Sequence, residues 1–177
     1  IIKYTVNGKH LRVRMHGTEI SQKRYLYDPS GRIAAEVSNA GSLQKHYITV
    51  LGHSPDYMNS GGSNHRIIKD HLGSVRLVVN ASNGKIVQRI DYGSYGKVTL
   101  DSNPGFQPFG FAGGLYDHHT QLVRFGARDY DPETGRWTSK DPILFAGGDT
   151  NLYGYVANDP VNWVDPDGLK KTFVFQN

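Results

Sequence analysis

The segments YDPSGRI, residues 27–33, and YDPETGRW, residues 130–137, decide how this chain is interpreted. Each begins with tyrosine and an Asp-Pro pair and ends with glycine, arginine and an apolar residue. An Asp side chain accepts hydrogen bonds from nearby backbone amides, proline fixes φ at about −65°, and glycine accepts positive φ. The repeated segment therefore predicts a tight turn between two antiparallel strands.

Two looser copies lie between these segments: DHLGSVRLV, from Asp70, and DYGSYGKV, from Asp91. A further hairpin is expected at Asn83-Gly84, inside the apolar run RLVVNASNGKIVQRIDY. Stacked hairpins of this kind bury their faces against their neighbours, so the chain is expected to be all-β. The remaining segments are expected to be a polar mobile loop over residues 55–66, an irregular connection over 100–110, and short helical turns near 147–158 capped by Asp149 or Thr150.

Composition excludes several function classes. The 20 basic and 16 acidic residues give a net charge of +4, and the basic residues are scattered, so no nucleic-acid partner is predicted. Apolar runs are only a few residues long, so no membrane span is predicted. The chain has no cysteine, His118-His119 lacks the spacing of a zinc motif, and no glycine loop has a phosphate-binding pattern. We therefore predict neither a metal nor a cofactor.

Three longer runs carry a family resemblance. The segments RIIKDHLGSVRLVVNASNGKIVQRIDYGSYGKV, FGFAGGLYDHHTQLVRFGARDYDPETGRWTSKDPI and NLYGYVANDPVNWVDPDGL occur in this order. Together they resemble the Rhs-repeat-associated core that ends the YD-repeat shell of Rhs polymorphic toxins and of the insecticidal toxin complex C component. Teneurins have a related form of this shell.

The resemblance implies a sheet that spirals into a hollow cocoon and encloses a C-terminal toxin domain. Residues 1–65 would then be YD-repeat shell strands, residues 66–169 the core with a self-cleavage site, and residues 170–177 the start of the cargo. The remaining shell would come from the same precursor or from another chain. The implied partners are the toxin domain and a secretion spike or toxin-complex component. The resemblance also implies a bacterial protein that is made in the cytoplasm and exported.

The family core ends in Asp-Pro-x-Gly-Leu and is cut after the leucine, which here corresponds to the bond between Leu169 and Lys170. The resemblance assigns the two carboxylates of the site to Asp141 and Asp165, and an accompanying arginine to Arg128. Two carboxylates that share one proton can supply both the base that activates water and the acid that protonates the leaving nitrogen. The arginine fork would orient a carboxylate or stabilise a developing oxyanion.

Each assignment has a simpler alternative. Asp-Pro also starts ordinary turns, and Arg128 could pair with Asp129 or Asp131 instead. Trp137 and Trp163 are expected to pack in the interior rather than to bind a ligand. Leu144-Phe145 departs from the glycine that often follows the family's Asp-Pro-Ile. At the level of the whole chain, the alternatives to a self-cleaving shell are a structural encapsulation module without cleavage and a surface adhesion or carbohydrate-binding module.

Overall fold

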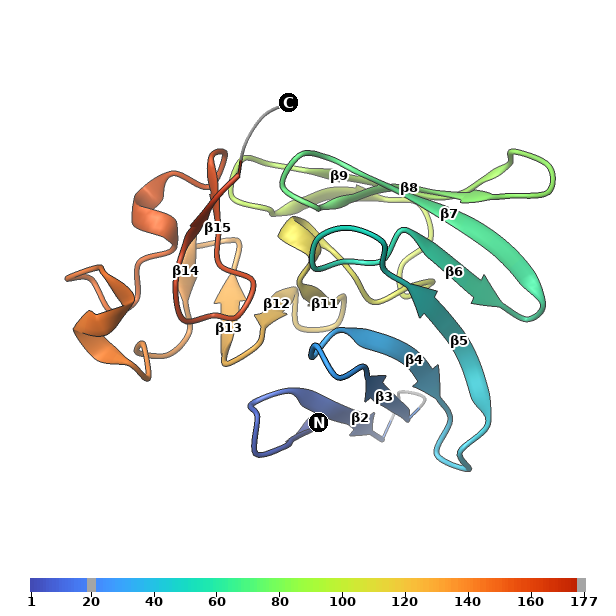
Figure 1. Cartoon of the computed structure of the whole chain (residues 1–177), viewed down its shortest axis with the longest axis horizontal. Helices are drawn as coiled ribbons and strands as arrows, with labels where there is room; N and C mark the ends of the chain where they lie inside the picture. Colours follow the sequence, from blue (N-terminus) through green and yellow to red (C-terminus); the bar gives the residue numbers. More distant parts are fainter. Residues whose placement is uncertain (19–21, 175–177) are drawn as a thin grey trace.

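The computed structural model describes residues 1–18 and 22–174. Ten strands form an antiparallel sheet in which each strand pairs with the next along the chain. These strands are β1 (Ile2–Val6), β2 (Arg12–Gly17), β3 (Lys23–Tyr27), β4 (Ile33–Val37), β5 (Leu43–Ile48), β6 (Tyr57–Ser60), β7 (Ser63–Lys69), β8 (Val75–Asn80), β9 (Ile86–Tyr92) and β10 (Val98–Asp101). Figure 1 shows the sheet as an open arc, with the yellow segment that follows β10 running along its concave side.

The C-terminal part of the chain builds two smaller sheets. A four-stranded sheet contains β11 (Leu115–Asp117), β12 (Leu122–Phe125), β13 (Arg128–Asp131) and β14 (Arg136–Trp137), and β15 (Trp163–Val164) pairs with β16 (Thr172–Phe173). The helical content of the described ranges is three short 3₁₀ turns: η1 (Phe111–Gly113), η2 (Leu144–Gly147) and η3 (Val156–Asn158). The all-β prediction is confirmed.

The YD-type segments form the predicted turns. At the first of them, the Asp28 amide donates to the Arg32 carbonyl (2.8 Å), and the Gly31 amide donates to the Asp28 carbonyl (3.0 Å). The Asp28 carboxylate also accepts the Arg32 amide (2.9 Å), and Gly31 has φ of +81°. This is a three-residue hairpin loop whose last residue must be left-handed, which is why glycine stands there.

The same pair of backbone bonds recurs in the turns that begin at Asn7, Ser38, Asp70 and Gly93. The turns at Asn7 and Ser38 escaped prediction because the expected pattern starts with aspartate, and these turns start with asparagine and serine. Their Asn7 and Ser38 side chains nevertheless accept the same amide, four residues on, that Asp28 accepts. The usable signal was therefore an acceptor side chain followed three residues later by a residue that tolerates positive φ.

The expected mobile loop at residues 55–66 was wrong. Strands β6 and β7 occupy most of it, and Ser60 pairs with Ser63 across a two-residue turn. Gly61 and Gly62 both have positive φ, +58° and +80°, as the tightest hairpin loops require. The polar composition reflects strands with one exposed face. The hairpin at Asn83-Gly84 is confirmed, with β8 and β9 on either side.

The expected helix cap was also wrong. The two C-terminal 3₁₀ turns flank residues 149 and 150 rather than starting at them. The Asp149 carboxylate accepts the Asn151 amide (2.8 Å) in a local turn and caps no helix. A short polar side chain satisfies such a turn as readily as a helix start, so the sequence signal was ambiguous.

Two buried clusters hold the chain together. In the first, the concave face of the ten-stranded sheet packs on Phe109 and Leu115 from the segment after β10. The second is largely aromatic and joins the small sheets; its most buried rings are Phe111, Phe125, Tyr130, Trp137 and Tyr155. The rings of Tyr130 and Tyr155 lie 4.3 Å apart between centroids. The candidate site packs against this second cluster, where Arg128 contacts the Trp137 ring.

Ion pairs connect the first strands to the small sheet. Arg12, which is 4% exposed, donates to Asp129 (2.7 Å), and Arg124 donates to the other oxygen of the same carboxylate (3.1 Å). Tyr4 also donates to Asp117. Residues more than one hundred positions apart are thereby joined, and Asp129 is committed to the face of β13 opposite the candidate site.

Candidate active site

Strand alternation directs Arg128 inward at the first position of β13. Arg128 and Tyr130 are buried, whereas the intervening Asp129 points to Arg12 and Arg124. Arg128 is 3% exposed, and its guanidinium carbon lies 4.1 Å from the centroid of the Trp137 ring. Trp137 therefore packs in the interior, as predicted, and its ring also contacts the guanidinium of Arg128.

The two carboxylates of the prediction meet at this arginine. Arg128 Nη2 lies 3.0 Å from Asp141 Oδ2 and 3.3 Å from Asp165 Oδ2. The alternative pairing of Arg128 with Asp129 or Asp131 is not the one the structure contains. Burial lowers the pKa of the Arg128 guanidinium from its ordinary value, and the charges of the two carboxylates oppose that change.

Asp141 is oriented by its own backbone surroundings. Its carboxylate Oδ1 accepts the Ile143 amide (2.9 Å), and its amide donates to the Leu152 carbonyl (3.0 Å). Oδ2 is left to face Arg128. The Asp-Pro step at this position therefore does act as a turn starter, and the same turn aims the second oxygen into the site.

Asp165 contacts the bond that the resemblance marks for cleavage. Its Oδ1 accepts the amides of Leu169 (2.9 Å) and Lys170 (3.0 Å), and the latter is the nitrogen of that bond. Arg128 Nε donates to the Gly168 carbonyl at 2.6 Å, one peptide upstream. The contacts of Arg128 thus orient both carboxylates and the chain entering the bond.

Burial raises the pKa of the Asp165 carboxyl from its ordinary value. The hydrogen bond from the Leu169 amide and the charge of Arg128 oppose this, and the nearby Asp141 charge adds to it. A raised pKa increases the fraction of a carboxyl group that is protonated at a given pH. The protonated form is the one that can give a proton to a leaving nitrogen.

Glycine in the Asp-Pro-x-Gly-Leu segment allows backbone to approach backbone. A Cβ on Gly168 would lie 2.3 Å from the Phe125 carbonyl oxygen, and one on Gly126 would lie 2.4 Å from the Asp167 carbonyl oxygen. Between them the Ala127 amide donates to the Asp167 carbonyl (2.9 Å). This contact fixes the segment against the loop that leads into β13, so that Asp165 and Arg128 share one site.

A cavity of about 20 Å³ lies among these groups. Its lining includes both carboxylates, Arg128 and Leu169, and it also includes residues that the sequence did not suggest: Gly147, Asp149, Asn151, Leu152, Gly154, Val156, Ala157 and Lys171. A cavity needs roughly 10–15 Å³ by this measure to hold one water molecule, so there is room for about one. The added residues come from a turn-rich segment whose spacing carries no periodic signal.

Beyond the bond between Leu169 and Lys170, the chain continues as β16, which pairs with β15. Trp163 pairs with Phe173, Val164 pairs with Thr172, and the Val174 amide donates to the Asn162 carbonyl (2.9 Å). The Trp163 and Phe173 rings meet edge to face with 5.1 Å between centroids. The bond between Leu169 and Lys170 is thus held on both sides, by Gly168 upstream and by β16 downstream.

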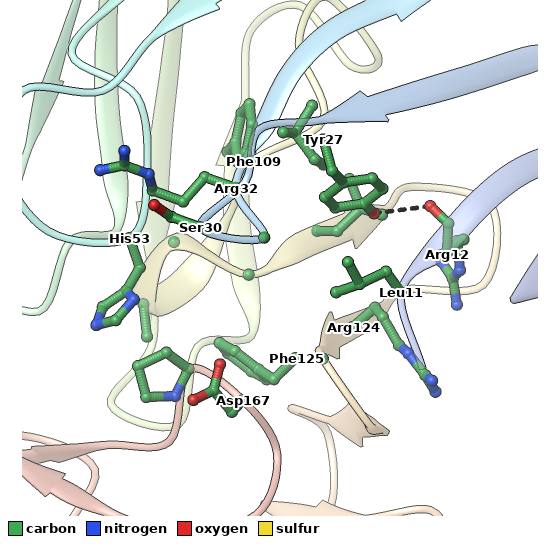
Figure 2. A pocket seen from close by; sticks show the side chains of 18 residues that line it. Leu11, Arg12, Tyr27, Ser30, Arg32, His53, Phe109, Arg124, Phe125 and Asp167 are labelled. Carbon is green, nitrogen blue, oxygen red and sulfur yellow. Dashed lines mark hydrogen bonds between the residues drawn. The ribbon is translucent and has the colours of Figure 1, made fainter. Parts of the chain in front are cut away.

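A larger cavity, of about 110 Å³, is lined in part by Pro166 and Asp167 of the Asp-Pro-x-Gly-Leu segment. Figure 2 labels Asp167, Phe125, Arg32, His53 and Arg124 among the residues that line it. Tyr27 donates to the Arg12 carbonyl at its rim (2.7 Å). Its lining has several cations and lacks a pair of carboxylates, so hydrolytic chemistry of the predicted type fits the smaller cavity.

Other features carry no comparable arrangement. The adjacent rings of His118 and His119 are tilted by 37° with 3.9 Å between centroids, and the described part of the chain holds no cluster of three or more His, Cys, Asp or Glu side chains suited to a metal. Within residues 1–18 and 22–174, no helix has the length and apolar character needed to cross a bilayer.

Comparison with known proteins identifies the family of the chain as a whole. A family model of the teneurin YD-shell matches residues 51–161. Teneurin-3 of Danio rerio is 32% identical over 196 residues, which cover 90% of this chain and 7% of the teneurin. A crystal structure of TcdB2-TccC3-TEV superposes with a TM-score of 0.73 at 24% identity, covering 95% of this chain and 9% of that one. A Tc holotoxin pore of Photorhabdus luminescens gives a TM-score of 0.62 at 20% identity over 99% of this chain and 10% of that one.

The two kinds of comparison support different statements. The structural neighbours show the fold of the Tc-type YD shell, and the chain spans less than a tenth of the length of the curated relative. The relative is a fish protein, so the sequence match itself does not indicate a bacterial origin. Identity over most of the chain and the family match over residues 51–161 agree with each other: this chain belongs to the teneurin YD-shell family and forms part of a YD-repeat shell.

Proposed function

We propose that this chain closes a YD-repeat shell and cuts itself between Leu169 and Lys170 by aspartic-type hydrolysis. The observation that carries the proposal is the contact of one carboxylate, Asp165, with the nitrogen of that bond at 3.0 Å, while a second, Asp141, shares Arg128 with it. Arrangements of this kind are suited to hydrolysis without a metal or a covalent intermediate.

The geometry suggests separate roles for the two carboxylates. Asp141, on the cavity side, takes a proton from a water molecule, and the resulting hydroxide attacks the Leu169 carbonyl carbon. The carbon–nitrogen bond then breaks as Asp165 gives its proton to the Lys170 nitrogen. The new Leu169 carboxylic acid returns a proton to Asp165, and Asp141 passes the proton that it took from water to the Lys170 amine. The products are a Leu169 carboxylate and a Lys170 ammonium group, with one water consumed and both aspartates restored. Arg128 holds both carboxylates throughout and acts as a positioning group.

The curved sheet supports the encapsulation part of the proposal. Ten strands alone form an open arc, and β1 and β10 each pair with a single neighbour among the described strands. Further YD-repeat strands, from the same precursor or from another chain, would continue the arc into a closed wall. The segment from Lys170 onward would lead into a C-terminal toxin domain inside it, and export with a secretion spike or a toxin-complex component would follow from that role.

A second candidate is a purely structural shell module that is not cut. The observation that favours it is the continuation of the chain past the marked bond into β16, whose partner strand and aromatic contacts belong to the shell. A permanently joined strand would serve the same wall without any chemistry.

Intact-mass analysis separates the two candidates. The wild-type chain should yield two fragments that divide after Leu169, whereas Asp141→Asn and Asp165→Asn should each stay whole. Asp159→Asn is the matched control, because Asp159 also precedes a proline but binds the Asn162 side chain outside the site. A wild-type chain that stays whole after folding would leave the structural module as the function.

A further inference from the structure

We propose that Gly147 is a positioning residue of the site, because its missing side chain provides the space for the attacking water. This inference rests on the proposed self-cleavage and adds a residue that the carboxylate pair alone does not identify. Gly147 is at the end of η2, in the segment between Asp141 and Asp149, and lines the small cavity.

The argument begins with what a side chain at residue 147 would meet. A Cβ there would lie 2.6 Å from Asp141 Oδ2 and 3.1 Å from the Leu169 carbonyl oxygen. The first distance is inside the 3.0 Å limit that real Cβ atoms essentially never cross. The point next to Gly147 is therefore close both to an oxygen of the proposed base and to the oxygen of the carbonyl to be attacked.

The two short distances also limit how far apart those oxygens are. They are no farther from each other than the two distances together, a span that one water molecule with two ordinary hydrogen bonds can about bridge. The cavity has room for about one water, so a single methyl group would occupy the space that the water needs. Glycine is required at this position for that room, since its φ lies outside the left-handed range that would demand glycine by itself.

The next residue supplies a matched control. Gly148 has φ of +84°, and a Cβ on it would meet no atom within 4 Å. Gly148→Ala therefore adds the same methyl group one position away, into open space, and the left-handed φ adds backbone strain. Gly147→Ala adds the methyl group to the cavity with no left-handed strain. Strain in the loop and loss of space are thus tested by different variants.

The experiment has a kinetic arm and a structural arm. In the kinetic arm, the full chain is refolded and the cut after Leu169 is followed by mass. Gly147→Ala should slow the first-order cleavage by about 100-fold or more, because the methyl group takes the space of the attacking water and lost positioning of a reacting group has effects of that size. Gly148→Ala should cleave within a few-fold of wild type. The residual cleavage of Gly147→Ala should keep the pH profile of wild type, since both carboxylates remain, whereas general disruption of the site would change it.

In the structural arm, crystal structures of uncut Asp141→Asn, with and without Gly147→Ala, are compared for an ordered water beside residue 147. We expect the water with glycine and no water with alanine. Near wild-type cleavage by Gly147→Ala, equal slowing by Gly148→Ala, or an empty cavity beside Gly147 would each overturn the inference. A wild-type chain that is never cut would instead contradict the proposed function, and the water comparison would still decide whether Gly147 makes the space.

Discussion

Replacing Arg128 by methionine removes the cation that lies between two buried carboxylates. The side chains of Arg128, Asp141 and Asp165 are only 3%, 8% and 5% exposed, so solvent screens their interaction weakly. Removing one partner of a buried ion pair typically lowers the free energy of unfolding by about 3–5 kcal/mol, because the remaining charge is left uncompensated. Arg128→Lys keeps the charge but not the planar fork that also reaches the Gly168 carbonyl. At pH 7.5 we therefore expect Arg128→Met to be less stable than Arg128→Lys by about 3 kcal/mol or more.

The pH dependence of this difference tests the cause. Burial raises the pKa of the Asp165 carboxyl in the folded chain, and without the guanidinium the positive charge no longer opposes this rise. A carboxyl group with a raised folded pKa destabilises the fold at high pH and ceases to do so as the pH falls and the group takes up a proton. The gap between the two variants should therefore shrink to less than about 1–2 kcal/mol near pH 4.

Urea unfolding followed by tryptophan fluorescence measures both values. Both Arg128 variants should stay uncut, which intact mass verifies, so intact chains are compared with intact chains. A gap that is the same at pH 7.5 and pH 4, or one below about 1 kcal/mol at pH 7.5, would show that the carboxylates are not held by this arginine.

Three further predictions concern cleavage. The pKa of Asp165 is raised, so its protonated fraction grows as the pH falls, and the cleavage rate should rise from pH 8 toward pH 5; a rate that increases with pH over this range would contradict its role as the acid. Gly168→Ala should abolish cleavage, because a Cβ would lie 2.3 Å from the Phe125 carbonyl oxygen and push the bond out of the site; mass analysis that still finds the cut would refute this. Val174→Pro removes the amide that donates to the Asn162 carbonyl and should slow cleavage by about 10-fold or more, while Val174→Ala, which keeps the amide, should cut nearly as wild type; equal rates for the two would exclude a role for the downstream strand.

The turns were the part of the fold that local sequence determines. Asp28 followed by proline and a glycine at residue 31 specifies a hairpin within five residues, because each requirement is met by a neighbour in the chain. The same locality explains the misses. Residues 55–66 look like a loop by composition, but the pairing of β6 with β7 depends on Gly61 and Gly62 fitting a two-residue turn and on an inner face that packs on the sheet.

The candidate site shows the opposite dependence. The family resemblance named Arg128, Asp141 and Asp165, yet no periodicity links residues that are 13 and 24 positions apart along irregular chain. Their meeting depends on the close approach of Gly168 to the Phe125 carbonyl and on the aromatic cluster beneath β13. The sequence by itself determined an all-β chain of hairpins, and its family resemblance predicted a cut after Leu169. The tertiary structure alone decided which carboxylate touches the bond after Leu169 and that Gly147 leaves space beside it. Both depend on contacts between segments that lie far apart in the sequence, and only packing brings such segments together in space.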